Sequence, residues 1–176
     1  KSDLDNLVAL LGIQRFELDP GDPLQSIPPT MESDADLRAR AVLTPEGYSV
    51  AGPEGAYEAL AINSDAGVLD AKATSPAPCE VVVTVLARSG DGTPDQAMLD
   101  TVNAAVSADT ARPMTDLVTV EAATIVNFTV EGTRWTYAGP DSAVVLAASD
   151  ASLQDYLTAT HRLGMDVTLA GLHAAI

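Results

Sequence analysis

The run of β-branched residues in "EVVVTVLA", residues 80–87, limits the possible folds of this chain more than any other feature. Valine and threonine restrict their own side-chain rotamers and favour a pleated, buried strand. The run stands between two turn-forming stretches, "SPAPCE" before it and "GDGTPD" after it. We therefore expect residues 67–75 and 80–88 to form a β-hairpin with a buried second strand.

A capped helix and a third strand are expected to follow the hairpin. Thr93 is a good N-cap, Pro94 suits the first helical position, and Gln96 completes a capping box. Helical spacing joins Met98, Leu99, Val102 and Val106 into an apolar stripe, and a strand is expected from Leu117. The order β-β-α-β predicts a compact α+β unit.

The N-terminal residues predict two helices separated by a loop. The first spans residues 2–12, with Ser2 as its N-cap, an apolar face at Leu4, Leu7, Val8 and Leu11, and Gly12 at its end. Residues 19–30 contain four prolines, so we expect a loop there, preceded by a short strand in "QRFEL". Ser33 and Asp36 then resemble a capping pair for a helix that runs to about Leu43. The arm and its loop are the parts expected to order only upon assembly.

The C-terminal part of the chain has a strand pattern followed by a helix pattern. From Val118 to Val130 the even positions are apolar, and after Gly132 the apolar positions become odd, with Trp135 and Tyr137 expected in a strand core. A helix is expected over residues 141–160, with Leu146, Leu153, Tyr156 and Leu157 facing inward, and another begins in the last ten residues. We expect a chain of this kind to continue past residue 176. Three parts are predicted: an arm at 1–45, a central α+β domain at 46–122 and a C-terminal α+β domain at 123–176.

Charge excludes several classes of function. The 176 residues include 25 acidic and 9 basic ones, a formal net charge of -16, so clustered cations for nucleic acid are missing. No apolar run is long enough to cross a membrane, and the N-terminus does not have the pattern of a signal peptide. The acidity fits either solubility, as in a salt-adapted host, or docking onto a basic partner. The single cysteine, Cys79, can form no internal disulfide.

No motif predicts a catalytic, cofactor-binding or metal-binding residue. Gly47 and Gly52 in "GYSVAGPEGAY" have the GxxxxG spacing of a phosphate loop, but Pro53 and Glu54 stand where that motif has Lys and Ser or Thr. "GDGTPD" lacks the ligand spacing of a calcium loop. His161 and His173 stand twelve residues apart without further ligands, and no G-x-S-x-G elbow occurs.

The order of several stretches resembles the baseplate J-like proteins of contractile phage tails. These stretches are "LDPGDP", "ESDADLRARAVLTPEGYSVAGPEGAYEALA", "SPAPCEVVVTVLARSGDGTPD" and "ARPMTDLVTVEAATIVNFTV", and the similarity continues through "YAGPDS" and "HRLGMDV". The similarity covers nearly all of the chain, and the motifs are specific as an ordered set.

The resemblance implies a structural role in which the protein carries no reaction. Proteins of this family build the wedges around the central spike, and they contact a lysozyme-like wedge protein, other wedge subunits and copies of themselves. The implied location is the virion tail baseplate, assembled in the bacterial cytoplasm. Related proteins occur in tailocins and other contractile injection machines, which remains an alternative.

In this family the motif residues are expected to form turns rather than a reactive site. The first group packs a helix start against its neighbours, the second joins a strand to a helix, and the third returns that helix to the sheet. The groups are Gly47, Tyr48, Gly52, Pro53, Gly55, Ala56 and Tyr57; Gly90, Asp91, Gly92, Thr93 and Pro94; and Arg112, Pro113, Thr115 and Asp116.

The sequence departs from the family pattern in two ways. Family members usually have glycine at the position of Cys79, which predicts strain if φ is positive there. They also run on past residue 176.

Two alternative functions come from other classes. A small acidic hydrolase would show a concave pocket with a perturbed carboxylate, and a carbohydrate-binding module would need Trp135 and Tyr137 exposed.

Overall fold

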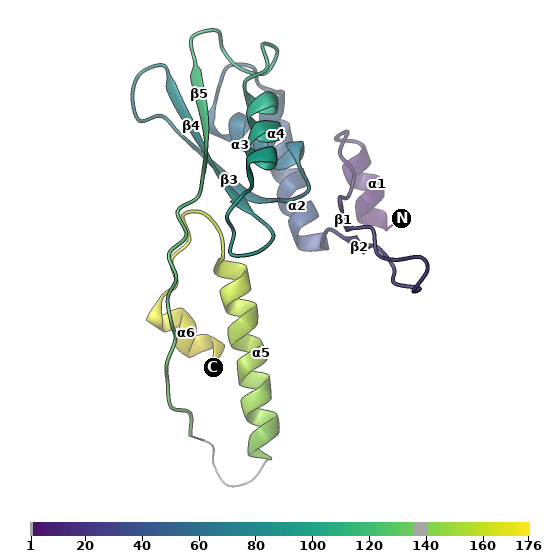
Figure 1. Ribbon diagram of the computed structural model, residues 1–176, viewed down its shortest axis with the longest axis vertical. Helices are drawn as coiled ribbons and strands as arrows, with labels where there is room; N and C mark the ends of the chain where they lie inside the picture. The colour runs from purple at the N-terminus through teal and green to yellow at the C-terminus, as the bar shows by residue number, and fades with distance from the viewer. Residues whose placement is uncertain (1, 136–140) are drawn as a thin grey trace. The chain divides into compact units, whose positions relative to one another are not determined.

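The computed structural model describes residues 2–135 and 141–176, in two compact units, Lys1–Ile125 and Val126–Ile176. Figure 1 shows the elements of both units, which are described separately here. The three-part division at residues 45 and 122 stays a prediction.

The first unit begins with a short helix and a small hairpin. Helix α1 (Asp3–Ala9) starts at Ser2, whose hydroxyl accepts from the Asp5 N–H, so the predicted cap is confirmed. Of the predicted apolar face of this helix, only Val8 is buried. Strands β1 (Glu17–Asp19) and β2 (Thr30–Met31) pair antiparallel, so regular structure frames the stretch that was expected to be a loop.

Three helical elements lead from the hairpin to the sheet. Helix α2 (Asp34–Leu43) starts at Ser33, whose hydroxyl accepts from the Asp36 N–H, as the sequence predicts. A 3-10 turn, η1 (Thr44–Tyr48), and helix α3 (Glu54–Ser64) follow. Pro53 is the N-cap of α3 rather than its first helical residue, and its missing N–H still leaves no helical hydrogen bond unmade.

The predicted hairpin and third strand are confirmed. Strands β3 (Val68–Thr74) and β4 (Glu80–Ala87) pair antiparallel, and β5 (Leu117–Ala122) pairs parallel to β4. Helix α4 (Gln96–Val106) connects β4 to β5, as a parallel pair requires.

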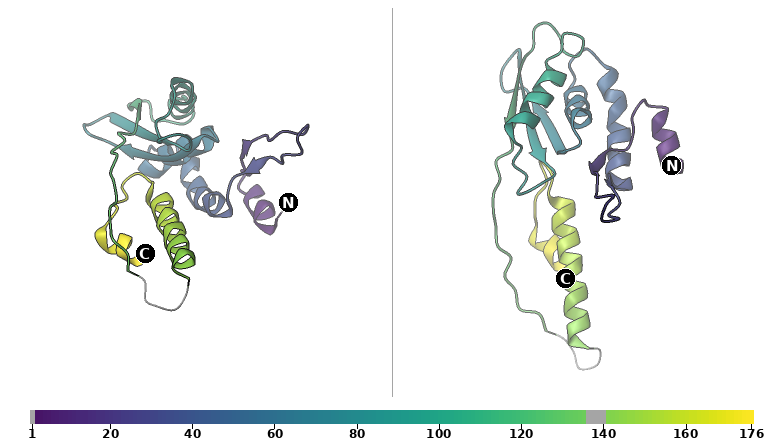
Figure 2. Two further views of the ribbon diagram at one scale, coloured as in Figure 1. Left: turned by 60° about the horizontal axis from the view of Figure 1, so that its bottom comes forward. Right: turned by 45° about the vertical axis from the view of Figure 1, so that its right-hand side comes forward.

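Helices α3 and α4 cover one face of this sheet, as Figure 2 shows. In the register, Ala71 lies opposite Val85 and Ala73 opposite Val83, so alternate residues of both strands face the helices. The core is almost entirely small and aliphatic, with Tyr57 as the large exception; it comprises Tyr57, Ala61, Val68, Ala71, Ala73, Val81, Val83, Val85, Val102 and Val106. The predicted stripe of α4 is confirmed, because Met98 and Leu99 pack against this core.

The predicted N-cap of α4 is wrong by two residues. Asp95, not Thr93, caps the helix, and its carboxylate accepts from the Met98 N–H at 2.8 Å. The Thr93 N–H instead donates to the Asp91 carboxylate at 3.0 Å, which forms a local turn that keeps Pro94 outside the helix. A negative charge at the N-cap also suits the helix dipole.

The second unit contains helices α5 (Ser142–Thr160) and α6 (Leu169–Ala175). Both helices are confirmed, and the four predicted inward residues of α5 are half-buried. The predicted strand beyond Ala122 is wrong, because residues 123–135 contain no strand. A strand needs a hydrogen-bonded neighbour, and the alternating pattern alone cannot supply one. Trp135 is 88% exposed, so its predicted place in a strand core is also wrong, and Tyr137 lies outside the described residues.

Candidate assembly surface and the contacts that support it

The residues of the first and third motif groups meet at the start of α3. Gly52 has φ +76, and a Cβ there would lie 2.8 Å from Pro113 Cγ and 2.9 Å from Asp116 Oδ2. Any larger residue would be strained and would collide with the 112–116 turn. The Tyr57 hydroxyl donates to Asp116 Oδ2 at 2.7 Å, which ties α3 to the residue before β5.

Arg112 stabilises the 112–116 turn through hydrogen bonds to two backbone carbonyls. Its Nε donates to the Ser107 carbonyl at 2.9 Å, and its guanidinium also donates to the Asp116 carbonyl at 2.9 Å. Burial, followed by the hydrogen bond to the Asp116 carboxylate, raises the pKa of Tyr57 above its ordinary value. Tyr57 therefore stays protonated as a donor, which suits a structural contact. Thr115 donates to the Asp116 carboxylate at 3.3 Å.

The remaining residues of the first motif group pack η1 against α3. A Cβ on Gly47 would lie 3.2 Å from Ala59 Cβ, and one on Gly55 would lie 3.1 Å from Glu46 Cγ. Ala56 is buried, and the Tyr48 hydroxyl donates to the Leu11 carbonyl at 2.8 Å. The small size of Gly47, Gly55 and Ala56 lets η1 and α3 lie close together.

The second motif group lies at the opposite end of α4 from Arg112. Gly90 and Gly92 both have positive φ, and the Ala87 N–H donates to the Gly92 carbonyl at 2.8 Å. The hydrogen bond between Thr93 and Asp91 continues this turn toward Pro94. The structure thus separates the second group from the other two, and the motif residues do not form one site.

A buried ion pair between Arg40 and Glu32 attaches the N-terminal residues to the helices, and the sequence analysis missed it. Arg40 Nε lies 3.0 Å from Glu32 Oε1, and a terminal nitrogen of Arg40 lies 2.6 Å from Oε2. Arg40 also donates to the Asn63 side chain at 2.8 Å and stands 4.0 Å from the centroid of the Phe16 ring. Both charged side chains are almost fully buried. One signal was available: Arg40 lies three residues after the buried Leu37, on the same helical face.

Arg15 extends this arrangement to α1 and to the start of α2. It contacts the Asp5 carboxylate at 2.8 Å, the Asp34 carboxylate at 2.6 Å and the Glu32 carbonyl at 2.6 Å. The Ser2 N–H and then the Arg15 guanidinium lower the pKa of Asp5 to about 2. Arg15, Glu32, Arg40 and these partners are called the Arg40 network below.

One pocket lies beside the first motif group, and its acidic residue is Glu54. It has a volume of about 140 Å³ and is lined by Gly52, Glu54, Tyr57, Ala73, Thr74, Ser75 and Val81. Lys72 pairs with Glu54 and, at 2.9 Å, with Glu58, and this contact lowers the pKa of Glu54. Glu54 is therefore held as a carboxylate.

Metal ligands and membrane spans were sought in residues 2–135 and 141–176. There, no three His, Cys, Asp or Glu side chains gather closely enough to hold a metal ion. None of the helices in these ranges combines the length and apolar character needed to cross a bilayer.

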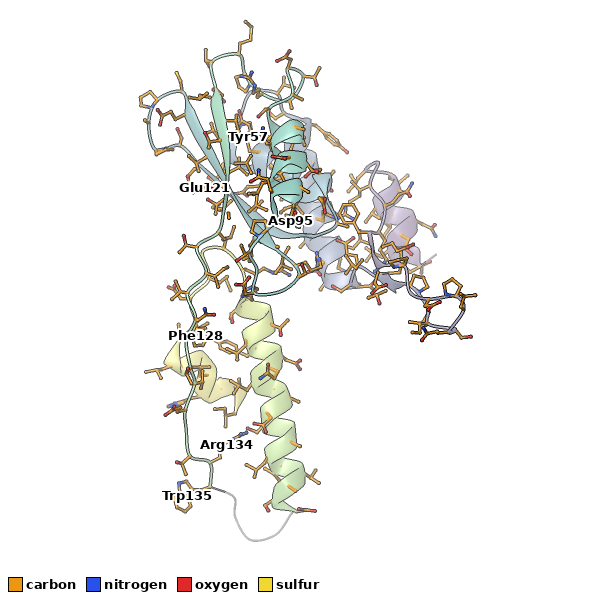
Figure 3. The ribbon with its side chains drawn as sticks, in the orientation of Figure 1. Tyr57, Asp95, Glu121, Phe128, Arg134 and Trp135 are labelled. Atoms are coloured by element: carbon orange, nitrogen blue, oxygen red, sulfur yellow. The ribbon has the colours of Figure 1, made fainter. Side chains whose placement is uncertain are left out.

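The exposed apolar side chains form separate groups on the two units. In the first unit, Leu24, Ile27 and Met31 belong to the β1–β2 hairpin, and Met114 and Leu117 flank the 112–116 turn. In the second unit, Val126, Phe128 and Trp135 are exposed along the segment before α5. Figure 3 labels Phe128 and Trp135 with Arg134, which donates to the Ser149 hydroxyl at 2.6 Å and pairs with Asp150. Such side chains can belong to surfaces that other proteins cover when they lie together in a patch.

Comparison with known proteins identifies the class of the central part. Residues 49–122 match the model of the Baseplate J-like central domain, which covers α3, the three-stranded sheet and α4. This segment therefore belongs to the Baseplate J-like central domain family, and the resemblance expected from the sequence is confirmed.

A relative extends the similarity to the rest of the chain. The chain is 39% identical over 178 residues to a protein named baseplate protein J of Escherichia phage P2. The match covers 99% of this chain and 59% of the relative, so the chain spans well under two thirds of the relative's length.

Proposed function

We propose that this protein is a structural subunit of the baseplate of a contractile phage or prophage tail, and that it acts in baseplate assembly. The observation that carries the proposal is the similarity to baseplate protein J over 99% of the chain. The match of residues 49–122 to the Baseplate J-like central domain supports it from a second direction.

The proposed activity is the formation of protein–protein interfaces, with no reaction carried. Its partners would be other wedge proteins, including the lysozyme-like wedge protein, and copies of itself, assembled in the bacterial cytoplasm. Exposed apolar side chains on both units support this proposal. The contacts of the motif residues support it too, because they join backbone segments and use no reactive group.

The division into an arm at 1–45, a central domain at 46–122 and a C-terminal domain at 123–176 belongs to the same proposal. The turn residues of the three motif groups would act by fixing the shape of the central domain. The close approach of Gly52 to Asp116 supports this proposed role most directly.

Deletion of the gene in the strain that produces the particles tests this proposal. We expect induced cells to yield heads without complete tails, and complementation with the wild-type gene to restore them. Mass spectrometry of the purified complemented tails should recover the protein. Complete, contracting tails from the deletion strain would contradict the proposal.

The same experiment separates a phage from a tailocin or another injection machine. Particles with filled heads, encoded beside capsid genes, would identify a phage. Headless contractile particles from an operon without capsid genes would identify the alternative.

A further inference from the structure

The β1–β2 hairpin projects from the first unit as a closed, apolar-tipped loop. In Figure 1 the loop between β1 and β2 extends beyond α1 and α2, and the left view of Figure 2 shows it pointing away from these two helices. Leu24 at its tip is 97% exposed, and Ile27 and Met31 are 51% and 44% exposed. An isolated exposed leucine is common, but three large apolar side chains on one projecting loop are a candidate docking element.

Hydrogen bonds hold the tip in one conformation in the structure, whereas the sequence predicted that the arm and its loop order only upon assembly. Asp22 and Ile27 exchange backbone hydrogen bonds of 3.0 and 2.9 Å, and the Asp22 carboxylate accepts from the Leu24 N–H at 2.8 Å. Gly21 has φ +66, and a Cβ there would collide with the Ile27 carbonyl oxygen. A loop that is already ordered loses less conformational entropy when it binds, so its apolar tip can contribute more to affinity.

The Arg40 network holds both ends of the hairpin. The Glu32 N–H donates to the Phe16 carbonyl at 2.8 Å, and the Phe16 N–H donates to the Glu32 carboxylate at 3.2 Å. Glu32 follows β2 directly and is paired with Arg40 on α2. A buried ion pair is weak evidence for stability, but in some proteins such pairs specify one arrangement of the chain, and we infer that role here. Here it sets the direction in which the hairpin points.

The charge of the hairpin defines the partner. Residues 16–37 contain six acidic residues and no Lys or Arg. Glu32, Asp34 and Asp36 pair with arginines of this chain, whereas Glu17, Asp19 and Asp22, around the apolar tip, have no arginine or lysine partner within residues 2–135 and 141–176. The whole chain has a net charge of -16, so a second copy would be repelled at this site.

We propose that the β1–β2 hairpin, residues 17–31, inserts Leu24 into an apolar pocket on a different protein of the tail, and that lysine or arginine residues border that pocket. The proposal rests on the proposed baseplate function. It names one docking element of this chain and the chemistry of the surface that receives it.

Photo-crosslinking in assembled particles tests the proposal. The full-length protein with p-benzoylphenylalanine in place of Leu24 is produced in the deletion strain, and purified tails are irradiated and analysed by mass spectrometry. We expect crosslinks to one other tail protein, at apolar residues with Lys or Arg beside them. A crosslink to a second copy of this chain, or to no protein at all, would overturn the proposal.

A charge substitution at the tip provides an independent readout. We expect Leu24→Asp to reduce incorporation into tails at least tenfold relative to the wild type. Leu10→Asp is the matched control, because Leu10 is also highly exposed but lies at the end of α1, outside the hairpin. Incorporation of both variants at the wild-type level would overturn the proposal.

The outcomes distinguish this proposal from the baseplate function on which it rests. If the wild type is found in tails and Leu24→Asp enters them equally well, only the hairpin proposal fails. If the wild type is absent from complete tails, the baseplate function itself fails.

Discussion

The central sheet and the N-terminal segment, residues 2–33, are held in place by different forces. The sheet and its two helices bury a core of small aliphatic residues such as Val83 and Val102. The N-terminal segment buries only Val8 and Glu32 and is attached through the Arg40 network. Apolar burial is non-directional and tolerates similar side chains, whereas a buried ion pair requires both partners in one geometry. The comparison indicates that the core supplies stability and the network supplies orientation.

Removing Arg40 is expected to have the largest effect. Arg40→Met leaves the Glu32 carboxylate buried and unpaired, a change that costs about 3–5 kcal/mol in comparable sites. The N-terminal segment should detach, because detachment returns Glu32 to water. Hydrogen exchange should show loss of protection at the Phe16 and Glu32 amides.

The control for this variant is Arg38→Met, which removes an exposed pair with Asp34 at 3.6 Å and should cost about 0–1 kcal/mol. If Arg40→Met lowered hydrogen-exchange protection equally in β4 and at Phe16, the contrast between core and network would be contradicted, because the network would then stabilise the whole first unit.

Truncation in the core should have the next largest effect, and a global one. Val83→Ala removes two methyl groups from a fully buried site, for a loss of about 2–3 kcal/mol from transfer and cavity terms. Urea unfolding measures this loss directly. Val82→Ala, on the half-buried opposite face of β4, is the matched control and should cost less than about 1 kcal/mol. Equal losses for the two variants would contradict the assignment of the core.

The contact between Tyr57 and Asp116 refines the comparison between the apolar sheet core and the polar Arg40 network, because it is a polar contact inside the central domain. Tyr57→Phe keeps the ring in the core and removes only the donor to the carboxylate, for an expected loss of about 1–2 kcal/mol. Tyr48→Phe removes an exposed hydrogen bond to the Leu11 carbonyl and should cost less than about 0.5 kcal/mol. Thermal unfolding of both variants measures the difference. If Tyr57→Phe left the stability unchanged, the hydrogen bond to Asp116 would not contribute to the stability of the central domain.

The smallest predicted effect is a gain at the hairpin turn between β3 and β4. Cys79, which stands where family members usually have glycine, has φ +64, and an L-residue in that region costs about 1–2 kcal/mol. Cys79→Gly removes this strain but increases the entropy of the unfolded chain, so the expected net gain is about 0.5 kcal/mol. Cys79→Ala should be neutral, and a stabilising Cys79→Ala would show that strain is not the cause.

Local signals explain which parts of the fold could be predicted from the sequence. The β-branched run at residues 81–86 and the serines at positions 2 and 33 act on their own neighbours, and each predicted element was found. The cap of α4 was misplaced because Thr93 and Asp95 are both good N-caps and only the turn at Asp91 decides between them. The strand beyond Ala122 was wrong because pairing depends on a neighbour outside the segment.

The contacts of Arg40 and Tyr57 join residues that are far apart in the sequence, so a local sequence pattern does not predict them. Arg40 meets Glu32 and Phe16 from positions 8 and 24 residues away, and Tyr57 meets Asp116 from 59 residues away. The family resemblance predicted the turns at which the motif residues lie. It gave no indication of the Arg40 network, because Arg40 lies in the last turn of α2, where a basic side chain is common on an exposed face.

Cryo-electron microscopy of the tails from the producing strain tests the central claim, that this chain is built into a baseplate. We predict density at the tail end that fits the three-stranded sheet with α3 and α4, with the β1–β2 hairpin entering a neighbouring protein. A baseplate resolved to side chains in which no density fits this fold would contradict the account.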